Sequence, residues 1–407
     1  MPNVAGDEIA SLVLEQFDRL PQKRKPAVRD NGIHEWVPMS GIVVEVNGSL
    51  KCLSLATGMK CLPACKIPLS NGTALHDWHA EILAIRSLNR FLLLECKAVA
   101  SGQPSRFIRH RSPEERHSPN PEAWQGQPFA LREGVKLHIY CSEAPCGDAS
   151  MELTMAAQDD ASPWEKPGPS SVVNEAMLSG RGYFSLLGIV RRKPARGDAP
   201  PTLSKSCSDK LALKQCTSLL SSVTSLLIHP GNAYLSSITL PHSQFSATGC
   251  ARSFFGNGRM SPVAGRNWSG GYGFKEFEVK TTTLEFEYSK RVVGKRSERT
   301  SASNLAVAWS ADGSEEGLVG GVLQGRKQFD ARGASGTSRR GMWALARDVA
   351  GMEGVGCEEV VGLLEGKSYE DVKGGELLES RRHVKDAART EALKGWVRNT
   401  GDESFGL

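Results

Sequence analysis

Three short segments, far apart in the chain, most constrain how this sequence can fold. They are His79-Ala80-Glu81, Pro145-Cys146 and Ser206-Cys207-Ser208-Asp209-Lys210. Together they supply one imidazole, two thiols and a carboxylate that is not needed as a ligand. This is the donor set of a catalytic zinc site that keeps its fourth coordination position open. We therefore expect the fold to bring three distant segments to one point.

Each candidate ligand is predicted to lie at the start of a helix. Residues 79–97 lack Gly and Pro and are rich in Leu, Ile and Ala, which predicts a buried helix capped by Asp77. Cys146 follows a predicted strand and a proline, and Cys207 opens a helix-like segment. A helix N-terminus stabilises a thiolate, the form of cysteine that zinc binds. Taken singly the motifs are weak, because roughly one His-x-acid triplet is expected by chance and free cysteines are commonly small buried hydrophobes.

The donor set indicates a reaction class. In zinc-dependent nucleobase deaminases the metal activates water and a neighbouring Glu moves protons. Glu81 is the candidate for that carboxylate, and its structural alternative is an acid that interacts with the helix dipole. The widespread deaminase signature places two thiols on one turn, as P-C-x-x-C. Here Ala149 occupies the second of those positions, so Cys207 is the candidate third ligand.

Taken in order, these motifs resemble those of the adenosine deaminases acting on RNA and their tRNA-specific relatives. HAEI at 79–82, SEAPCGDAS at 142–150 and SCSDK at 206–210 match that family's three zinc motifs, and the resemblance extends from about residue 36 to the C-terminus. It implies an α/β fold with a cytidine-deaminase-like layered α-β-α core, additional helices and loop insertions. It also implies that His79, Cys146 and Cys207 bind one catalytic zinc ion and that Glu81 is the catalytic proton shuttle.

The resemblance implies a second cofactor, inositol hexakisphosphate, as a structural group buried in the core. A buried polyanion requires converging Lys and Arg side chains, since an unpaired buried charge is costly. The sequence departs from the family at His76, where Asn is common, and at Leu213-Lys214, where an Arg-Trp pair is common. Without the resemblance, the C-terminal segment would be interpreted as a solvated charged helix. The candidate ligands are Arg86, Lys210, Lys214, Tyr369, Lys373, Lys385, Trp396 and Asp402.

A dense basic segment just before SCSDK predicts contact with nucleic acid. Such cations position phosphates without reading sequence, although a solvated surface loop has the same composition. The segment Thr57-Gly58-Met59-Lys60 resembles the family's substrate-side loop. The net charge of +5 fits a polyanionic partner without requiring one. The candidate RNA-binding residues are Lys60, Arg191, Arg192, Lys193 and Arg196.

The choice of substrate follows from the resemblance. The double-stranded-RNA editors carry RNA-binding domains ahead of the catalytic domain, whereas here the deaminase-like sequence begins almost at the N-terminus. This favours the tRNA-specific branch and implies hydrolytic conversion of adenosine to inosine at position 37, next to the anticodon of alanine tRNA. Two alternatives stay open: a deaminase of another structured RNA, such as adenosine in double-stranded mRNA, or of cytidine, and a non-catalytic RNA-binding relative. Glu81 argues against the last, because a structural zinc site gives it no duty.

Composition and pattern predict the general organisation. Ten cysteines in 407 residues is below disulfide-scaffold density, no signal peptide is visible, and no apolar run reaches the roughly 18 residues of a membrane span. We expect an intracellular protein, cytoplasmic or nuclear, with tRNA as partner, no membrane contact and no obligate protein partner.

We expect one editase domain over residues 1–407, with flexible insertions at 100–132 and 311–357. Helices are predicted at 7–20, 79–97, 207–229 and 367–398, and strands at 41–46, 50–56, 135–141, 183–191, 279–288 and 305–309.

Overall fold

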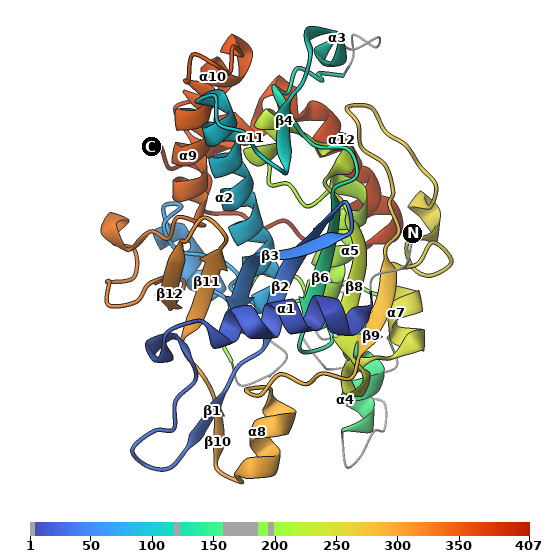
Figure 1. The fold of residues 1–407 in the computed structure, drawn as a ribbon, viewed down its shortest axis with the longest axis vertical. Coiled ribbons are helices and arrows are strands. Elements are labelled where there is room, and N and C mark those ends of the chain that lie inside the picture. Colours follow the sequence, from blue (N-terminus) through green and yellow to red (C-terminus); the bar gives the residue numbers. More distant parts are fainter. Residues whose placement is uncertain (1–4, 118–122, 158–185, 194–198) are drawn as a thin grey trace, which may run out of the picture.

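The computed structural model describes residues 5–117, 123–157, 186–193 and 199–407. Within these residues a mixed eight-stranded sheet runs through the molecule, with helices on both faces (Figure 1). The pairs from β13 to β6 are antiparallel, whereas β8 pairs with β6 and β9 in parallel. The predicted layered α/β fold is therefore confirmed. In sheet order the strands are β13 (Val322–Leu323), β12 (Glu315–Val319), β11 (Ala306–Ser310), β3 (Ser49–Thr57), β2 (Met39–Val46), β6 (Lys136–Cys141), β8 (Leu235–Pro241) and β9 (Glu278–Thr282).

The central hairpin has the predicted turn. Asn47 and Gly48 join β2 to β3, and both have positive φ, 51° and 77°. A two-residue hairpin turn of type I′ requires this backbone at both positions, which Asn-Gly adopts at low cost. Seven of the eight residues of β2 are buried, because helices cover this strand on both sides.

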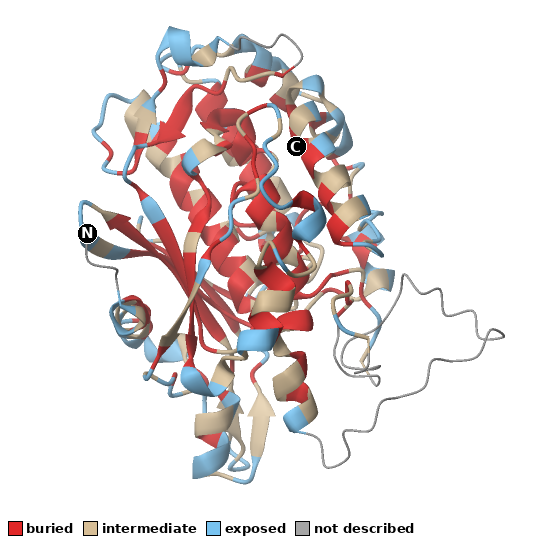
Figure 2. Ribbon diagram, turned by 90° about the vertical axis from the view of Figure 1, so that its right-hand side faces the viewer, coloured by how far each residue is buried: buried red, intermediate tan, exposed pale blue. Residues whose placement is uncertain are grey.

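Two hydrophobic cores lie on opposite faces of the sheet. On one face α1 (Gly6–Asp18) packs Ile9, Val13 and Phe17 against the strands. On the other face α2 (Ala80–Ala100) contributes an almost continuous buried surface to the larger core. Figure 2 shows the sheet as a buried layer between these helices. Both helices agree with the predicted segments, because their apolar residues recur at helical spacing.

The other elements surround this sandwich. A three-stranded sheet pairs β4 (Ile108–His110), β5 (Phe129–Leu131) and β7 (Ile228–His229), and a two-stranded one pairs β1 (His34–Trp36) with β10 (Thr300–Ala302). The remaining helices are α3 (Pro113–Arg116), α4 (Met151–Ala156), α5 (Cys207–Thr217), α6 (Thr224–Leu227), α7 (Ala247–Phe254), α8 (Lys290–Arg296), α9 (Arg339–Ala350), α10 (Glu358–Leu364), α11 (Tyr369–Gly374) and α12 (Glu379–Ala387).

Three predicted segments differ from the structure. The helix expected over 207–229 ends at Thr217, because Ser218 turns the backbone to a φ of 57°. The strand expected over 183–191 is wrong for its described part, since residues 186–191 form no strand and only Arg192 bridges to Lys205. The charged helix expected over 367–398 is divided into α11, α12 and short turns. Charge composition predicted helix there correctly but gave no signal for the breaks.

The two predicted insertions contain regular elements in their described parts. The first holds β4, α3 and β5, and the second holds β12, β13 and α9. Their flexibility and the single-domain organisation stay predictions. Among the described residues, no helix is both long and apolar enough to cross a membrane.

The start of β2 and the ends of β3 and β6 share one end of the sheet. Ser40 of β2 lies opposite both Ala56 of β3 and Cys141 of β6. The segment 142–146 leaves β6 at this end, and the segment 58–61 leaves β3 at the same end. The motif residues are therefore brought to one end of the sheet, where the chain leaves the central strands.

Gly41 lets α1 approach the sheet closely. A Cβ at this position would lie 2.5 Å from Cγ1 of Val13 in α1. We expect Gly41→Ala to lower the free energy of unfolding by about 1–3 kcal/mol through overpacking, measured by denaturant unfolding. Gly362→Ala, in α10 where nothing lies within 4 Å, is the control and should be neutral or stabilising. Equal stability of Gly41→Ala and the wild type would show that α1 shifts freely.

Candidate functional site

The two predicted cysteine ligands meet although they are far apart in the chain. Cys146 ends the segment that leaves β6, and Cys207 is the first residue of α5. The backbone N–H of Cys207 donates to Cys146 Sγ at 3.3 Å, and the N–H of Ser208 donates to the Cys146 carbonyl at 3.0 Å. Gly147 has a φ of 100°, and a Cβ there would collide with Ser206 Oγ. Glycine is thus required where the two motifs pack together.

The surroundings of the two sulfurs favour one thiolate. A hydrogen bond from Cys207 holds the pKa of the Cys146 thiol well below its usual range, and Lys193 and His79 act in the same direction. Lys193 Nζ also donates to Cys207 Sγ at 3.2 Å. Burial alone would lower the pKa of Lys193, but Asp77 and the two cysteines raise it well above its usual value. The ammonium form of Lys193 is therefore favoured beside the sulfur pair.

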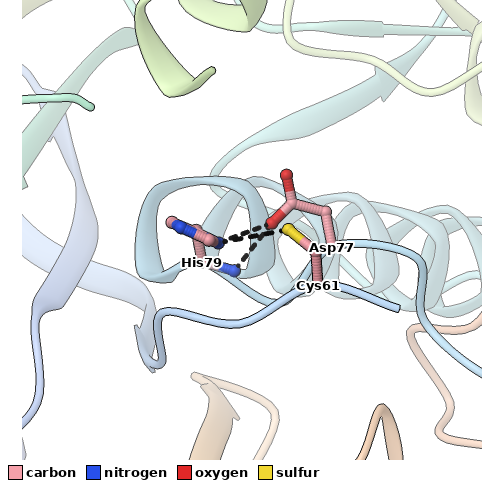
Figure 3. A group of neighbouring side chains, drawn as sticks. All are labelled: Cys61, Asp77 and His79. Carbon is pink, nitrogen blue, oxygen red and sulfur yellow. Dashed lines mark hydrogen bonds and ion pairs between the residues drawn. The ribbon is translucent and has the colours of Figure 1, made fainter. Parts of the chain in front are cut away.

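His79 is oriented by Asp77 at the start of α2 (Figure 3). Asp77 Oδ1 accepts from the His79 backbone N–H at 3.0 Å and from its Nδ1 at 2.9 Å. His79 itself is the N-cap of the helix, so Asp77 supports the helix start from outside, not as the predicted cap. With Nδ1 bound to a carboxylate, Nε2 is the nitrogen available to a metal.

Asp77 is a buried junction of several charged and polar groups. Its Oδ2 accepts from Lys193 Nζ and from Ser204 Oγ, both at 2.8 Å, and forms an ion pair with Lys210. Burial would raise the pKa of Asp77, but Lys193, Lys210 and His79 outweigh it and hold that pKa well below its usual range. The carboxylate stays charged because the described residues that contact its oxygens are hydrogen-bond donors.

Cys61, Asp77 and His79 have ligand atoms within 4.8 Å of one another. Cys61 Sγ lies 3.6 Å from His79 Nδ1, on the loop after β3 (Figure 3). Donor number alone makes this trio a possible metal site. Both oxygens of Asp77 already accept hydrogen bonds, and Oδ1 accepts one from His79 Nδ1. We therefore interpret Asp77 as the group that orients His79, and we assign the metal-facing role to Nε2 of His79.

Glu81 lies in the first turn of α2 and is 7% exposed. Burial raises its pKa and the nearby Cys146 adds to the rise, while His79 and Lys193 act against it. A carboxyl group with a raised pKa accepts and releases protons closer to neutral pH. The structure thus brings the predicted base, the two thiols and the oriented imidazole into one electrostatically coupled group.

The predicted RNA-binding residues are divided by the structure. Arg191 and Lys193 are buried, at 1% and 4% exposure, so the prediction that they contact RNA phosphates is wrong for these two. Local charge density does not distinguish an internal cation, such as Lys193 paired with Asp77, from an external one. Lys60 lies at the site edge and donates to Asn304, Arg192 is half-buried, and Arg196 lies outside the described residues.

The predicted polyanion residues gather into a second, internal group. Lys214 Nζ donates to the carbonyls of Leu219 and Leu220 at 2.9 Å, and Arg86 Nε donates to the Thr337 carbonyl at 2.7 Å. Burial lowers the pKa of Lys214 and of Lys385 well below its usual value, with Arg381 adding to both, and lowers that of Lys373 to about 8. These bases are close enough to repel one another inside the protein.

The predicted aromatic and acidic members lie among the same cations. Tyr369 has the guanidinium of Arg339 and the ammonium of Lys373 each 5.7 Å from its ring centroid. Trp396 lies beneath Arg389, at 5.2 Å. Asp402 accepts from the Gly72 N–H at 2.7 Å and from His76 Nε2 at 2.8 Å. Asp402 also forms an ion pair with Arg339 at 3.3 Å, so it holds the surrounding loops and neutralises one arginine of the group.

Sequence reasoning missed several cations of this group. Arg381 is 3% exposed and donates to the Thr217 carbonyl at 2.6 Å. The buried Nε atoms of Arg381 and Arg389 have no hydrogen-bond partner among the described residues. The residues missed are Lys205, Arg339, Arg381 and Arg389. Only their repeated basic character signalled them, and exposed helices share that composition.

A multivalent anion fits this group better than any single counter-ion. Buried cations whose partners are neutral carbonyls or hydroxyls are costly unless an anion pairs with them. The pKa of Lys205 also falls to about 7, through burial and then through Lys210 and Arg389. One ligand carrying several negative charges would satisfy all of these groups together.

Comparison with known proteins gives a consistent family. The sequence pattern of the adenosine-deaminase (editase) domain matches residues 54–400. A tRNA-specific adenosine deaminase 1 from Schizosaccharomyces pombe is 34% identical over 98% of this chain and 96% of its own length. Its namesake from Saccharomyces cerevisiae is 37% identical over 53% of each chain. The double-stranded RNA-specific editase Adar of Drosophila melanogaster is 29% identical over 59% of this chain and 34% of its own length.

The buried lysines predict an unusual pH dependence of stability. A folded-state pKa below the unfolded value means that the unfolded chain binds more protons, so stability rises with pH between the two values. For anion-free protein we expect the free energy of unfolding to rise as the pH increases from about 8, the pKa of Lys373, toward 10.5. Adding a polyanion should stabilise the protein at pH 7.5 and flatten this slope. Denaturant unfolding at several pH values measures both.

A matched pair of variants tests the same cluster. Lys385→Met should raise the free energy of unfolding of the anion-free protein by about 1–4 kcal/mol, because it removes an uncompensated buried charge. It should also reduce the stabilisation by added polyanion. Lys394→Met, at an exposed lysine, should change neither quantity. Destabilisation of anion-free protein by Lys385→Met would mean that the lysines are compensated within the chain itself.

Proposed function

The chain belongs to the adenosine-deaminase (editase) domain family, and we propose that it converts adenosine to inosine in tRNA by hydrolytic deamination. The observation that carries this proposal is the position of Glu81, which is buried and coupled to His79 and to Cys146, whose sulfur accepts from the Cys207 N–H. The choice of tRNA is supported by relatives named for it, one of which aligns with almost the whole chain. We further propose position 37 of alanine tRNA as the target.

We propose that His79 Nε2, Cys146 and Cys207 hold one zinc ion. One nitrogen and two thiolate sulfurs are ligands that zinc prefers. Lys193 favours the thiolate form of both cysteines, and Asp77 fixes the orientation of His79. When bound, zinc supplies Lewis-acid chemistry that lowers the pKa of water and so provides hydroxide near neutral pH.

Glu81 carries the proton movements in this proposal. Its carboxylate takes one proton from the attacking water and delivers it to the adenine ring nitrogen as the oxygen adds to the carbon that bears the amino group. It then transfers the remaining water proton to the amino group, which leaves as ammonia, so that adenosine and water give inosine and ammonia. The burial of Glu81 suits both transfers, because its raised pKa lies closer to that of its partners.

Asp77 acts as a positioning residue. It keeps the proton on His79 Nδ1 and holds Lys193 and Lys210 beside the site. Because these contacts join segments before α2 and before α5, they also fix the distance between the imidazole and the sulfurs. Loss of the carboxylate would loosen His79 without removing any ligand atom.

We propose inositol hexakisphosphate as the multivalent anion of the internal cationic group. Its phosphates would meet Arg86, Lys214, Lys373 and Lys385, together with the arginines that the sequence did not single out. Lys210, another predicted ligand, is ion-paired with Asp77. The anion would therefore act on the active site through charge and packing, in a structural capacity.

A tRNA target is consistent with the burial of the Glu81 side chain. Deaminases act on bases that have been taken out of the stack, and the unpaired bases of an anticodon loop can be splayed out at low cost. Another structured RNA is the alternative, and a comparison of tRNA with long duplex RNA separates the two.

Replacement of Glu81 tests the reaction. We expect Glu81→Ala to reduce inosine formation in transcribed alanine tRNA by at least about 10²–10⁴-fold, since a positioned general base is lost. Inosine is scored as A-to-G changes on sequencing, and zinc by elemental analysis. Zinc content should equal that of the wild type. Unchanged turnover would refute the mechanism, whereas conversion at a different adenosine would refute only the proposed position.

Asp77→Asn tests the orientation of His79. The variant keeps all three proposed ligands, but it loses the charge that fixes the imidazole and pairs with the two lysines. We expect zinc affinity to fall about 10–100-fold, as for other partners of metal-bound histidines, measured by competition with a chelator. Glu95→Gln, on the same helix away from the site, serves as control. Wild-type affinity in Asp77→Asn would show that packing alone orients His79.

A further inference from the structure

A second concave region lies beside the candidate active site. Its cavity has a volume of about 590 Å³ and is bordered by Arg29, Trp36, Lys60 and Lys290, with small residues of β10 and Asn304 completing the wall. Figure 1 shows β1, β10 and α8 together beyond one end of the large sheet. Arg29 and Trp36 precede residue 54, where the family match begins.

The lining of this cavity is cationic. It contains three basic side chains and no carboxylate among its lining residues. Arg29 is paired with Glu35 at 2.8 Å and Lys60 is bonded to Asn304, so both are held in place. Lys290 is exposed at the first position of α8. Such a surface attracts a polyanionic ligand.

Trp36 gives the cavity a flat aromatic wall. Lys290 Nζ lies 5.8 Å from the centroid of its ring. Trp36 pairs with Ala302 in the parallel β1–β10 ladder, and the small side chains of Thr300, Ser301 and Ala302 leave space beside the indole. An aromatic face next to cations is the combination that binds unpaired nucleotides, by stacking the base and pairing the phosphate.

The cavity adjoins the reaction site through two connections. Lys60 is followed by Cys61, whose Sγ lies 3.6 Å from His79 Nδ1, and the Lys60 carbonyl accepts from the Trp78 N–H at 3.0 Å. Lys290 is followed by Arg291, whose Nη1 lies 2.6 Å from Glu143 Oε2, three residues before Cys146. Both contacts connect residues next to the cavity lining with segments that carry the candidate zinc ligands His79 and Cys146.

We propose that this cavity binds an unpaired nucleotide of the RNA substrate near the reacting adenosine, with the base on Trp36 and phosphates at Lys290 and Lys60. The inference rests on the proposed RNA deamination and extends it to substrate recognition. It assigns binding, and no chemical role, to these residues. The stacking is tolerant of base identity, because every base presents a π-face.

The test measures binding of fluorescently labelled alanine tRNA by anisotropy, separately from inosine formation. Trp36→Ala should raise Kd about 10-fold or more, whereas Trp36→Phe should retain most of the affinity. Lys290→Ala should weaken binding and reduce the slope of log K against log salt by about one. Lys295→Ala, on the same helix but outside the lining, is the matched charge control. Thermal unfolding verifies that the variants are folded.

The outcomes separate this inference from the proposed reaction. Inosine formation by the wild type, with equal Kd for Trp36→Ala, Trp36→Phe and Lys295→Ala, would overturn the nucleotide cavity and leave the reaction standing. Binding that depends on Trp36 and Lys290, without inosine formation, would overturn the proposed reaction and leave the cavity standing. Equal losses of tRNA affinity in Lys290→Ala and Lys295→Ala would mean that α8 attracts RNA only through its overall charge. That result would also overturn the proposed nucleotide cavity.

Discussion

The buried carboxylate of Asp77 is the interaction on which the rest of the site depends. Its two oxygens take donors from His79, Lys193, Ser204 and Lys210, which come from chain segments far apart in sequence. A carboxylate that loses one of these partners in the interior would keep its desolvation cost without compensation. The contacts are therefore mutually dependent. They set the imidazole tautomer, the charge next to the sulfurs and the packing of the segment 199–206 against the start of α2 in a single arrangement.

The internal cations place a second constraint on the fold. A protein can tolerate several buried lysines and arginines when an anion is present, but repulsion and desolvation oppose folding when it is absent. Here Lys214 and Lys385 donate to carbonyls and a hydroxyl, and these neutral groups do not cancel their charge. The internal cations come from α5, α11 and α12. An anion that neutralised them would therefore also hold these C-terminal helices to the rest of the fold.

Sequence patterns predicted the parts that depend on local information. Asn47-Gly48 specifies its turn by backbone preference alone, and the periodic apolar residues of α1 and α2 specify which face is buried. The candidate ligand residues could be named because metal coordination demands particular side chains, and their role stays a prediction. The sequence patterns failed where segments of the same basic composition can be either buried or exposed. Arg191 and Lys193 occur in a basic segment that could be external, and their burial follows from partners in distant segments, Asp77 for Lys193. Arg381 is equally uninformative in sequence, since exposed helices are also rich in arginine. Ser218 ends α5 because its φ is 57°. The neighbouring sequence does not predict this backbone conformation.

The end of the sheet that carries the motifs explains why catalysis and substrate contact are adjacent. β3 and β6 end there and β2 begins there, so the loops that follow or precede them are free to carry function while the strands stay packed between two cores. The loop after β3 carries Lys60 and Cys61 in succession, so one side of it faces the cationic cavity and the other faces His79. Arg291 makes a similar connection from α8 to Glu143 on the loop after β6. These two connections join the β1–β10 pair and α8, which border the proposed nucleotide cavity, to the loops that leave β3 and β6 beside His79 and Cys146. The proposed recognition of a nucleotide and the proposed chemistry therefore share the loops at one end of the sheet.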